Sequence, residues 1–129
     1  MGQRFIAETS YHSLIASDAD ALAKTMGHLT ASDDAVVLVL ENGGKIVGML
    51  GAHVFMHPLS GDRIAAELFW WVEPEHRGAG LTLLRNAEQW AFEKDATAMQ
   101  MVAPNERIGL VYQALGYDKI EEHYQRTLK

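Results

Sequence analysis

The sequence predicts an α/β fold in which a mixed, mostly antiparallel sheet is flanked by helices. Three runs of strand-type residues follow one another between residues 35 and 72, a helical pattern covers residues 80–94, and an alternating segment comes after it. Consecutive strands joined by tight turns pair antiparallel, whereas a strand–helix–strand unit adds a parallel strand. The chain has 129 residues, of which 48% are hydrophobic, so we expect residues 1–129 to form a single domain with one core.

The first expected element is a helix. Ser17 followed by Asp20 resembles a capping box, which satisfies the free backbone N–H groups at a helix start. Apolar residues then recur at helical spacing up to the polar TASDD stretch, namely Leu22, Met26 and Leu29. We therefore expect a helix of roughly ten residues that begins at Asp18.

Three strands are expected next. The AVVLVL run from Ala35 to Leu40 is apolar throughout and rich in β-branched residues, ENGG forms a turn, and KIVGMLGAHVF continues as a strand. These segments predict a hairpin whose first strand is buried. After the HPLSGD turn, IAAELFWWV from Ile64 to Val72 predicts the third strand, which Pro74 ends.

A helix and a strand follow, which together with the third strand predict a βαβ crossover. From Gly80 to about Lys94, apolar residues recur at helical spacing, namely Leu81, Leu84, Ala87, Trp90 and Ala91. The segment from Thr97 to Ala103 alternates as a strand does.

The last predicted helix begins at Pro104 and Asn105 and ends at Gly116. One face of this helix is apolar and comprises Ile108, Val111, Tyr112 and Leu115. A final extended piece contains residues 123–128.

Composition excludes several classes of function. There is no cysteine, which removes disulfides, thiolate metal sites and cysteine-linked acyl intermediates and fits a reducing compartment. No segment approaches the roughly 20 apolar residues that span a bilayer, so we expect a cytoplasmic protein with no membrane partner. A net charge of −6 argues against nucleic acid and favours cationic partners. The six histidines form no H-E-x-x-H pattern, so we expect no metal.

The segment VEPEHRGAGLTLL places a glycine-containing turn between a strand and a helix. Such a turn lets backbone N–H groups approach an anion, and the helix dipole adds a favourable field, which together predict phosphate or pyrophosphate binding. The segment lacks the third glycine of a dinucleotide fingerprint and the Gly-Lys-Ser/Thr of a P-loop. The alternative is that the glycines only allow the helix to pack closely on the sheet.

The context of this turn resembles the GCN5-related N-acetyltransferase (GNAT) family. A strand ending in VEP, the turn EHRGAG, a helix and a strand are followed by Asn105, Tyr112 and the tripeptide LGY. The resemblance extends from about Val36 to the C-terminus and is strongest from Glu67 to Tyr117. It implies a GNAT-like fold with a splayed sheet, acetyl-CoA as co-substrate, and acetyl transfer to an amine.

The resemblance also implies which residues bind the cofactor. The family's acyl-CoA signature is Gln or Arg, two residues, Gly, one residue, and Gly or Ala, and here it is occupied by Arg77, Gly78, Ala79, Gly80, Leu81 and Thr82. Thr82 departs from the final small residue, and it either narrows the backbone approach or adds a hydrogen bond to the pyrophosphate. The backbone of Trp71 and Val72 would pair with the pantetheine arm like an added strand.

For the general base we expect Glu67, which lies five residues before Val72, as the base does in the histone-acetyltransferase branch of the family. By strand alternation Glu67, Phe69 and Trp71 share one face, so aromatic surface would raise the pKa of the carboxyl. The alternative is an exposed or ion-paired strand glutamate. Three residues near the turn are held as substitutes, namely Glu73, Glu75 and His76.

For the acid we expect Tyr112, which lies seven residues after Asn105 and four before Gly116, as the family's thiolate-protonating tyrosine does. The alternative is an aromatic residue at the edge of the core. Asn105 is expected to cap its helix and to contact CoA. Gly109 in the same helix suggests close packing or the approach of a ligand.

We expect direct attack in a ternary complex, because the chain has neither cysteine nor a G-x-S-x-G elbow. Backbone N–H groups near Trp71 and Val72 would polarise the thioester carbonyl. Only 34 residues precede Ala35, so the acceptor side is either open or completed by a second subunit of a homodimer. The acceptor is a small molecule, a protein amine or a modified base. The alternative function is a GNAT-fold structural or partner-binding module with weak or no turnover of acyl-CoA.

Overall fold

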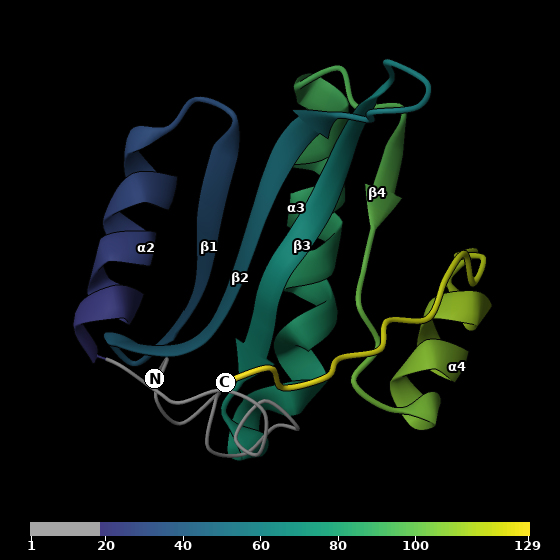
Figure 1. The fold of residues 1–129 in the computed structure, drawn as a ribbon. Coiled ribbons are helices and arrows are strands. Elements are labelled where there is room, and N and C mark those ends of the chain that lie inside the picture. Colours follow the sequence, from purple (N-terminus) through teal and green to yellow (C-terminus); the bar gives the residue numbers. More distant parts are fainter. Residues whose placement is uncertain (1–18) are drawn as a thin grey trace.

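The computed structural model describes residues 19–129 (Figure 1). The elements run in the order α2 (Ala19–Ala31), β1 (Ala35–Asn42), β2 (Lys45–Met56), β3 (Arg63–Val72), the 3₁₀ helix η2 (Pro74–Ala79), α3 (Gly80–Glu93), β4 (Ala98–Gln100) and α4 (Glu106–Ala114). The sheet has the order β1-β2-β3-β4, with antiparallel pairs up to β3 and a parallel pair between β3 and β4. The predicted mixed α/β sheet is confirmed. No helix within residues 19–129 is long and apolar enough to cross a membrane.

The hairpin of β1 and β2 forms as predicted, but the buried strand is the second one. Gly43 and Gly44 both have positive φ angles, +61° and +79°, which a two-residue hairpin turn requires. β2 lies between β1 and β3 and is buried from Val47 to Ala52, whereas β1 is an edge strand and is mostly half-buried. The expectation of a buried first strand was wrong, because an apolar run does not show whether a strand has one neighbour or two.

α3 covers one face of the sheet, with α2 beside β1 and α4 beyond β4 (Figure 1). The core at this face comprises Leu50, Ala52, Val72, Leu83 and Ala87. The predicted helix from Gly80 is thus confirmed. Its buried leucines are Leu83 and Leu84, while the predicted core position Leu81 is exposed.

The remaining expectations concern the length of β4, the C-terminal piece, and the length and start of α2. β4 has three residues rather than the predicted seven of Thr97–Ala103, because it diverges from β3 after Gln100. The C-terminal piece is not paired as a strand within residues 19–129. α2 is longer than predicted, at 13 residues. The proposed cap at Ser17 and the predicted helix start at Asp18 lie outside the described residues.

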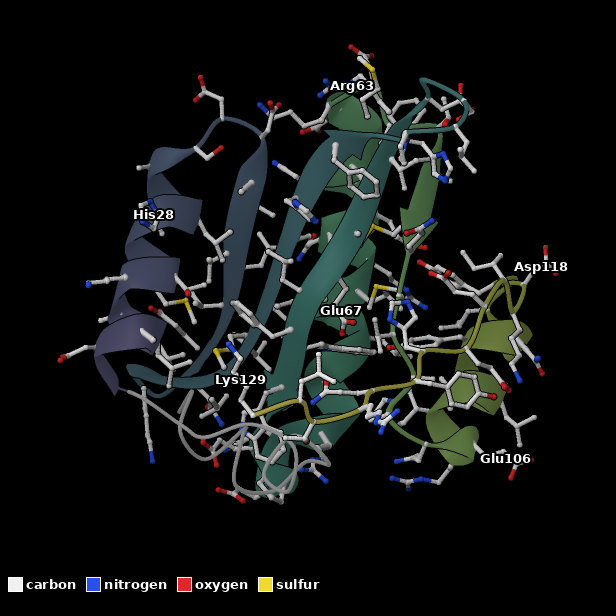
Figure 2. All side chains as sticks on the ribbon, in the orientation of Figure 1. His28, Arg63, Glu67, Glu106, Asp118 and Lys129 are labelled. Atoms are coloured by element: carbon white, nitrogen blue, oxygen red, sulfur yellow. The ribbon has the colours of Figure 1, made fainter. Side chains whose placement is uncertain are left out.

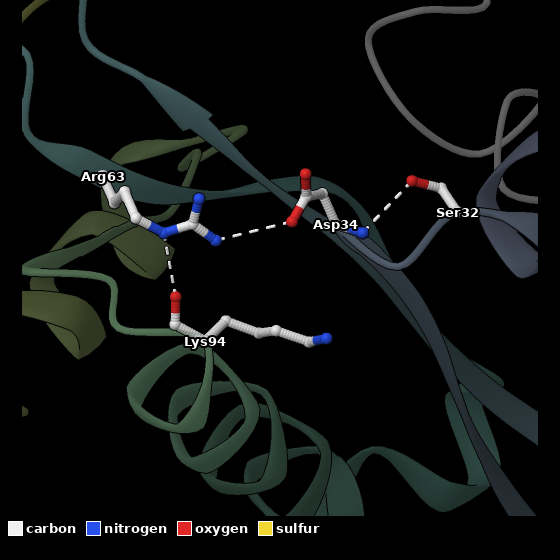
Figure 3. Close-up of polar contacts among 4 residues, drawn as sticks. All are labelled: Ser32, Asp34, Arg63 and Lys94. Carbon is white, nitrogen blue, oxygen red and sulfur yellow. Dashed lines mark hydrogen bonds and ion pairs between the residues drawn. The ribbon is translucent and has the colours of Figure 1, made fainter.

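Arg63, the first residue of β3, joins the β3–α3–β4 crossover at the end of the sheet where β3 begins (Figure 3). Its Nε donates to the Lys94 carbonyl oxygen at 3.0 Å, and an Nη lies 3.4 Å from an Asp34 carboxylate oxygen just before β1. The Arg63 carbonyl oxygen accepts from the Thr97 N–H at 2.8 Å. These contacts hold together the ends of the elements that carry the candidate site at the opposite end of the sheet.

Candidate active site

A β-bulge in β3 determines which face Glu67 occupies. Ala52 of β2 pairs with Glu67, whereas its neighbour Gly51 pairs with Phe69, so Leu68 is an extra residue on β3. Because neighbouring residues of β2 face opposite sides, Glu67 lies on the α3 face with Ala52, and Phe69 lies on the other face. The expectation that Glu67, Phe69 and Trp71 share one face was wrong, since simple alternation holds only without a bulge.

The Glu67 carboxylate reaches from β3 toward the chain that follows β4 (Figure 2). One carboxylate oxygen accepts a hydrogen bond from the Val102 N–H at 3.0 Å. Burial raises the pKa of Glu67 to about 7, and the hydrogen bond from Val102 partly opposes this rise. The predicted rise in pKa is present, although the tryptophan on the same face is Trp70, not Trp71. A carboxyl with this pKa exists in both protonation states near neutral pH.

Tyr112, which lies on α4, also binds Val102. Its hydroxyl donates to the Val102 carbonyl oxygen at 3.1 Å, and its ring stacks on Trp70 with 6.1 Å between ring centroids. The side chain is buried, and its pKa is raised by burial first and by the nearby Glu67 and Tyr117 second. The Tyr112 phenol therefore stays protonated over the physiological range. Glu67 and Tyr112, far apart in sequence, bind the N–H and the C=O of one residue.

The edge of β3 opens beside these residues. β4 pairs with β3 only where Ile64–Ala66 meets Ala98–Gln100. Beyond Ala66 that side of β3 has no strand partner within residues 19–129, and the Glu67–Val102 hydrogen bond spans the divergence. The predicted splay of the sheet is confirmed, and an extended ligand arm could lie along the free edge of β3.

The segment predicted as a glycine-rich turn folds as the 3₁₀ helix η2, which leads directly into α3. Gly78 and Ala79 are exposed, and a Cβ at Gly78 would meet no atom of the described residues within 4 Å. Gly80 is buried, and a Cβ there would lie 3.4 Å from Val72 and 3.5 Å from Trp70. Its N–H donates to the Arg77 carbonyl oxygen. Close packing of the helix on the sheet therefore explains why residue 80 is a glycine, whereas the missing side chain at Gly78 leaves room for an anion. Leu81 and Thr82, which follow Gly80, are exposed.

Arg77 is held against the end of β3. Its Nε donates to the Val72 carbonyl oxygen at 3.1 Å, and its guanidinium lies 4.7 Å from the centroid of the Trp71 ring. Trp71 and Val72 are buried. Only part of the Arg77 fork is used by these contacts, so its remaining N–H groups are donors that suit a phosphate.

Asn105 caps α4 as predicted, because its Oδ1 accepts from the Ile108 N–H at 3.0 Å. Gly109 is not tightly packed: a Cβ there would have one neighbour within 4 Å, Ala103 at 3.7 Å. The predicted apolar face of α4 is only partly buried, since Tyr112 is buried and Ile108 is half-buried, whereas Val111 and Leu115 are exposed.

Of the three substitute bases, Glu73 lies between β3 and η2, and Glu75 and His76 lie in η2. Glu73 is buried and donates its backbone N–H to the Val47 carbonyl oxygen, Glu75 is exposed, and the His76 ring lies 3.3 Å from the Asn42 side chain. Among residues 19–129 no group of His, Cys, Asp and Glu is arranged to hold a metal ion.

Three residues of the site have roles that depend on contacts between elements, and sequence reasoning missed them. Val102 joins Glu67 to Tyr112 through its backbone, which no side-chain pattern could reveal. Trp70 stacks on Tyr112, whereas its sequence places it simply among the aromatics of the sheet. The Tyr117 hydroxyl donates to a Glu88 carboxylate oxygen at 2.7 Å, and the LGY tripeptide was the only signal for it.

Residues 6–117 match the sequence model described as the acetyltransferase (GNAT) family. The fold resembles an aminoglycoside antibiotic 6'-N-acetyltransferase from Acinetobacter haemolyticus, with a TM-score of 0.70, 23% identity, and 92% of this chain and 87% of that chain covered. It also resembles AAC(6')-Iy in complex with the bisubstrate analogue CoA-S-monomethyl-acetylneamine, with a TM-score of 0.73, 19% identity, and 88% of this chain and 82% of that chain covered. A transcriptional regulator from Bacillus halodurans has a TM-score of 0.80 and 16% identity, with 98% of this chain and 89% of that chain covered. No curated protein sequence matches at a significant level.

Proposed function

Because the chain belongs to the acetyltransferase (GNAT) family, we propose that it is an N-acetyltransferase that transfers an acetyl group from acetyl-CoA to an amine by direct attack in a ternary complex. Residues 1–129 would form a single acyl-CoA-binding domain. The observation that carries the proposal is the joint binding of Val102 by Glu67 and Tyr112 beside the free edge of β3. In the proposed reaction these two residues supply a base and an acid on either side of the thioester.

In this mechanism Glu67 is the general base. An ammonium group cannot attack a thioester, so a proton must leave the acceptor nitrogen, directly to Glu67 or through a water. A carboxyl with a pKa of about 7 is a stronger base than an ordinary glutamate and is still ionised in about half of the molecules at neutral pH. The nitrogen then forms a bond to the thioester carbon, and backbone N–H groups near Trp71 and Val72 would stabilise the oxyanion.

Tyr112 is the acid of the same mechanism. When the carbon–sulfur bond breaks, the electron pair stays on sulfur, and the phenol transfers its proton to the CoA thiolate. The hydroxyl must leave the Val102 carbonyl oxygen to do so. As the amide forms, the acceptor nitrogen loses its second proton, which passes through solvent to the Tyr112 phenolate. Glu67 then releases its own proton to solvent, so acetyl transfer from acetyl-CoA to an ammonium group yields the amide, CoA and one proton.

The acetyl-CoA site proposed here combines the free edge of β3 with the turn. The pantetheine arm would follow the backbone at Trp71 and Val72, and the pyrophosphate would lie at the residues of the acyl-CoA signature, namely Arg77, Gly78, Ala79, Gly80, Leu81 and Thr82. Asn105 would contact CoA from the start of α4. Support comes from the open space at Gly78 and from the N–H groups of the Arg77 fork that make no hydrogen bond within residues 19–129.

The acceptor is proposed to be a cationic amine, since the net charge is −6. Aminoglycosides are the first compounds to test, because the Acinetobacter haemolyticus neighbour is an aminoglycoside acetyltransferase. Peptides with free N-termini or lysines, and nucleobase amines, complete the panel. A homodimer and a cytoplasmic location stay predictions of the sequence.

Calorimetric titration with acetyl-CoA and with CoA tests the cofactor proposal. The matched variants are Gly78→Glu and Gly78→Gln, because a side chain at Gly78 enters open space and should leave the melting temperature unchanged. Added negative charge at the turn should weaken binding at least about tenfold at low salt, and the neutral variant should weaken it less. Equal affinities for the two variants and wild type would place the pyrophosphate elsewhere. If wild type does not bind acetyl-CoA at millimolar concentration, the proposal that the protein is an acetyltransferase is refuted.

One observation favours the alternative of a structural or partner-binding module. The Gly80 N–H and the Val72 carbonyl oxygen, two groups near the proposed cofactor, are already bound by Arg77. A module of this kind would bind acyl-CoA weakly and acetylate nothing in the panel. Acetylation of any panel member by wild type, reduced in Glu67→Gln and Tyr112→Phe, would exclude it.

A further inference from the structure

We propose that Tyr117 and Glu88 are positioning residues for Tyr112: their hydrogen bond holds the C-terminal end of α4 against α3 and so directs the Tyr112 phenol toward the leaving sulfur. This inference rests on the proposed function, because it concerns the acid of that reaction. Neither residue is expected to touch acetyl-CoA or the acceptor.

The contacts form a continuous path from α3 to the acid. The Tyr117 hydroxyl donates to a Glu88 carboxylate oxygen of α3 at 2.7 Å. The Tyr117 N–H donates to the Tyr112 carbonyl oxygen at 3.0 Å, and the two rings lie 5.6 Å apart between centroids. Gly116, with φ at +97°, turns the chain so that Tyr117 folds back along α4.

Within residues 19–129, the large apolar residues around Tyr112 at this end of α4 are mostly exposed. Leu110 and Val111, which precede Tyr112, and Leu115, which follows the helix, are 60%, 40% and 43% exposed. Tyr112 is thus both the buried anchor of the helix and the proposed acid. Once its hydroxyl leaves the Val102 carbonyl oxygen, the stacking on Trp70 and the Tyr117–Glu88 hydrogen bond still attach this end of the helix.

The location of the pair separates positioning from folding. Glu88 is exposed and Tyr117 is half-buried, so water can replace the hydrogen bond when either partner is removed, and the melting temperature should change little. Misplacement of a proton donor, by contrast, affects the rate directly, because proton transfer requires hydrogen-bond distance.

The experiment measures acetyl transfer to the acceptor found in the panel, or hydrolysis of acetyl-CoA if none is found, for Tyr117→Phe, Glu88→Ala and Glu88→Gln. We expect Tyr117→Phe and Glu88→Ala to lower kcat about tenfold, with KM for acetyl-CoA within about twofold of wild type. Glu88→Gln should retain most of the activity, because its amide oxygen still accepts from Tyr117. The control Tyr124→Phe removes a similar hydrogen bond, from Tyr124 to Glu122, on the exposed C-terminal segment and should leave kcat unchanged.

A second measurement repeats Tyr117→Phe in the Tyr112→Phe background. If Tyr117 acts through Tyr112, the second substitution has no further effect on kcat there. A wild-type kcat for Tyr117→Phe, or the same loss in both backgrounds, overturns the proposal while the proposed function stands. If wild type neither acetylates an acceptor nor hydrolyses acetyl-CoA, both the proposed function and this inference are refuted. The assay of wild type distinguishes this outcome from failure of the inference alone.

Discussion

Replacing Glu67 with glutamine should stabilise the fold at alkaline pH while it lowers activity. Burial raises the pKa of this carboxyl from its ordinary value of 4.5 to about 7. Between these two values the folded protein holds the proton more tightly than the unfolded chain does, so the stability that the group contributes is complete below pH 4.5 and is lost as the pH rises through 7. The glutamine side chain of the variant would be neutral throughout and could still accept the hydrogen bond from Val102.

The magnitude follows from the size of the rise. At about 1.36 kcal/mol for each pKa unit, the difference between 4.5 and about 7 corresponds to roughly 3 kcal/mol. For 129 residues the entropy of unfolding is about 0.27 kcal/mol per kelvin, so Glu67→Gln should raise the melting temperature by about 10 °C at pH 8.5, relative to its effect at pH 4.5. Thermal unfolding of both proteins across this pH range measures it, with Glu41→Gln as an exposed control.

The kinetic half of this prediction has the opposite sign. The wild-type kcat/KM should rise with pH through about 7 as the base ionises, and Glu67→Gln should lose this limb together with about 10²–10⁴ of the rate. A stability difference between wild type and Glu67→Gln that does not change with pH would refute the raised pKa of the half-buried Glu67 carboxyl. A variant that is less stable than wild type at pH 8.5 would refute it equally.

Three further substitutions test the packing by thermal or denaturant unfolding. Gly109→Ala should stabilise the protein by about 0.5–1 kcal/mol, because the new methyl group fits and helical glycine is unfavourable; a destabilised variant would contradict this. Gly51→Ala should destabilise it by about 1–3 kcal/mol, because the Cβ would lie 2.4 Å from the Phe69 ring, and this cost should vanish in a Phe69→Ala background. Asp34→Asn should cost under about 0.5 kcal/mol, since its ion pair with Arg63 is exposed; a larger loss would show a stronger network.

Most of the fold could be predicted from local patterns. Hydrophobic period, turn residues and helix caps are properties of neighbouring residues, so the strands, the helix from Gly80 and the cap at Asn105 were all predictable. The length of β4 and the burial of β1 were not predictable, because neighbouring elements decide how far a strand is paired and how much of it is buried. The exposure of Val111 and Leu115 likewise depends on how α4 lies against the rest of the protein.

The candidate site divides in the same way. Residue types and their spacing are local, so the chain's chemical groups could be read directly, including Glu67 on a strand before the turn and Tyr112 on the helix after it. The meeting of both residues at Val102, and the position of Glu67 on the α3 face, became visible only in the folded protein. The physical reason is that a bulge is a mismatch between two strands, and a shared backbone partner is a contact between three segments, neither of which is encoded in any one of them.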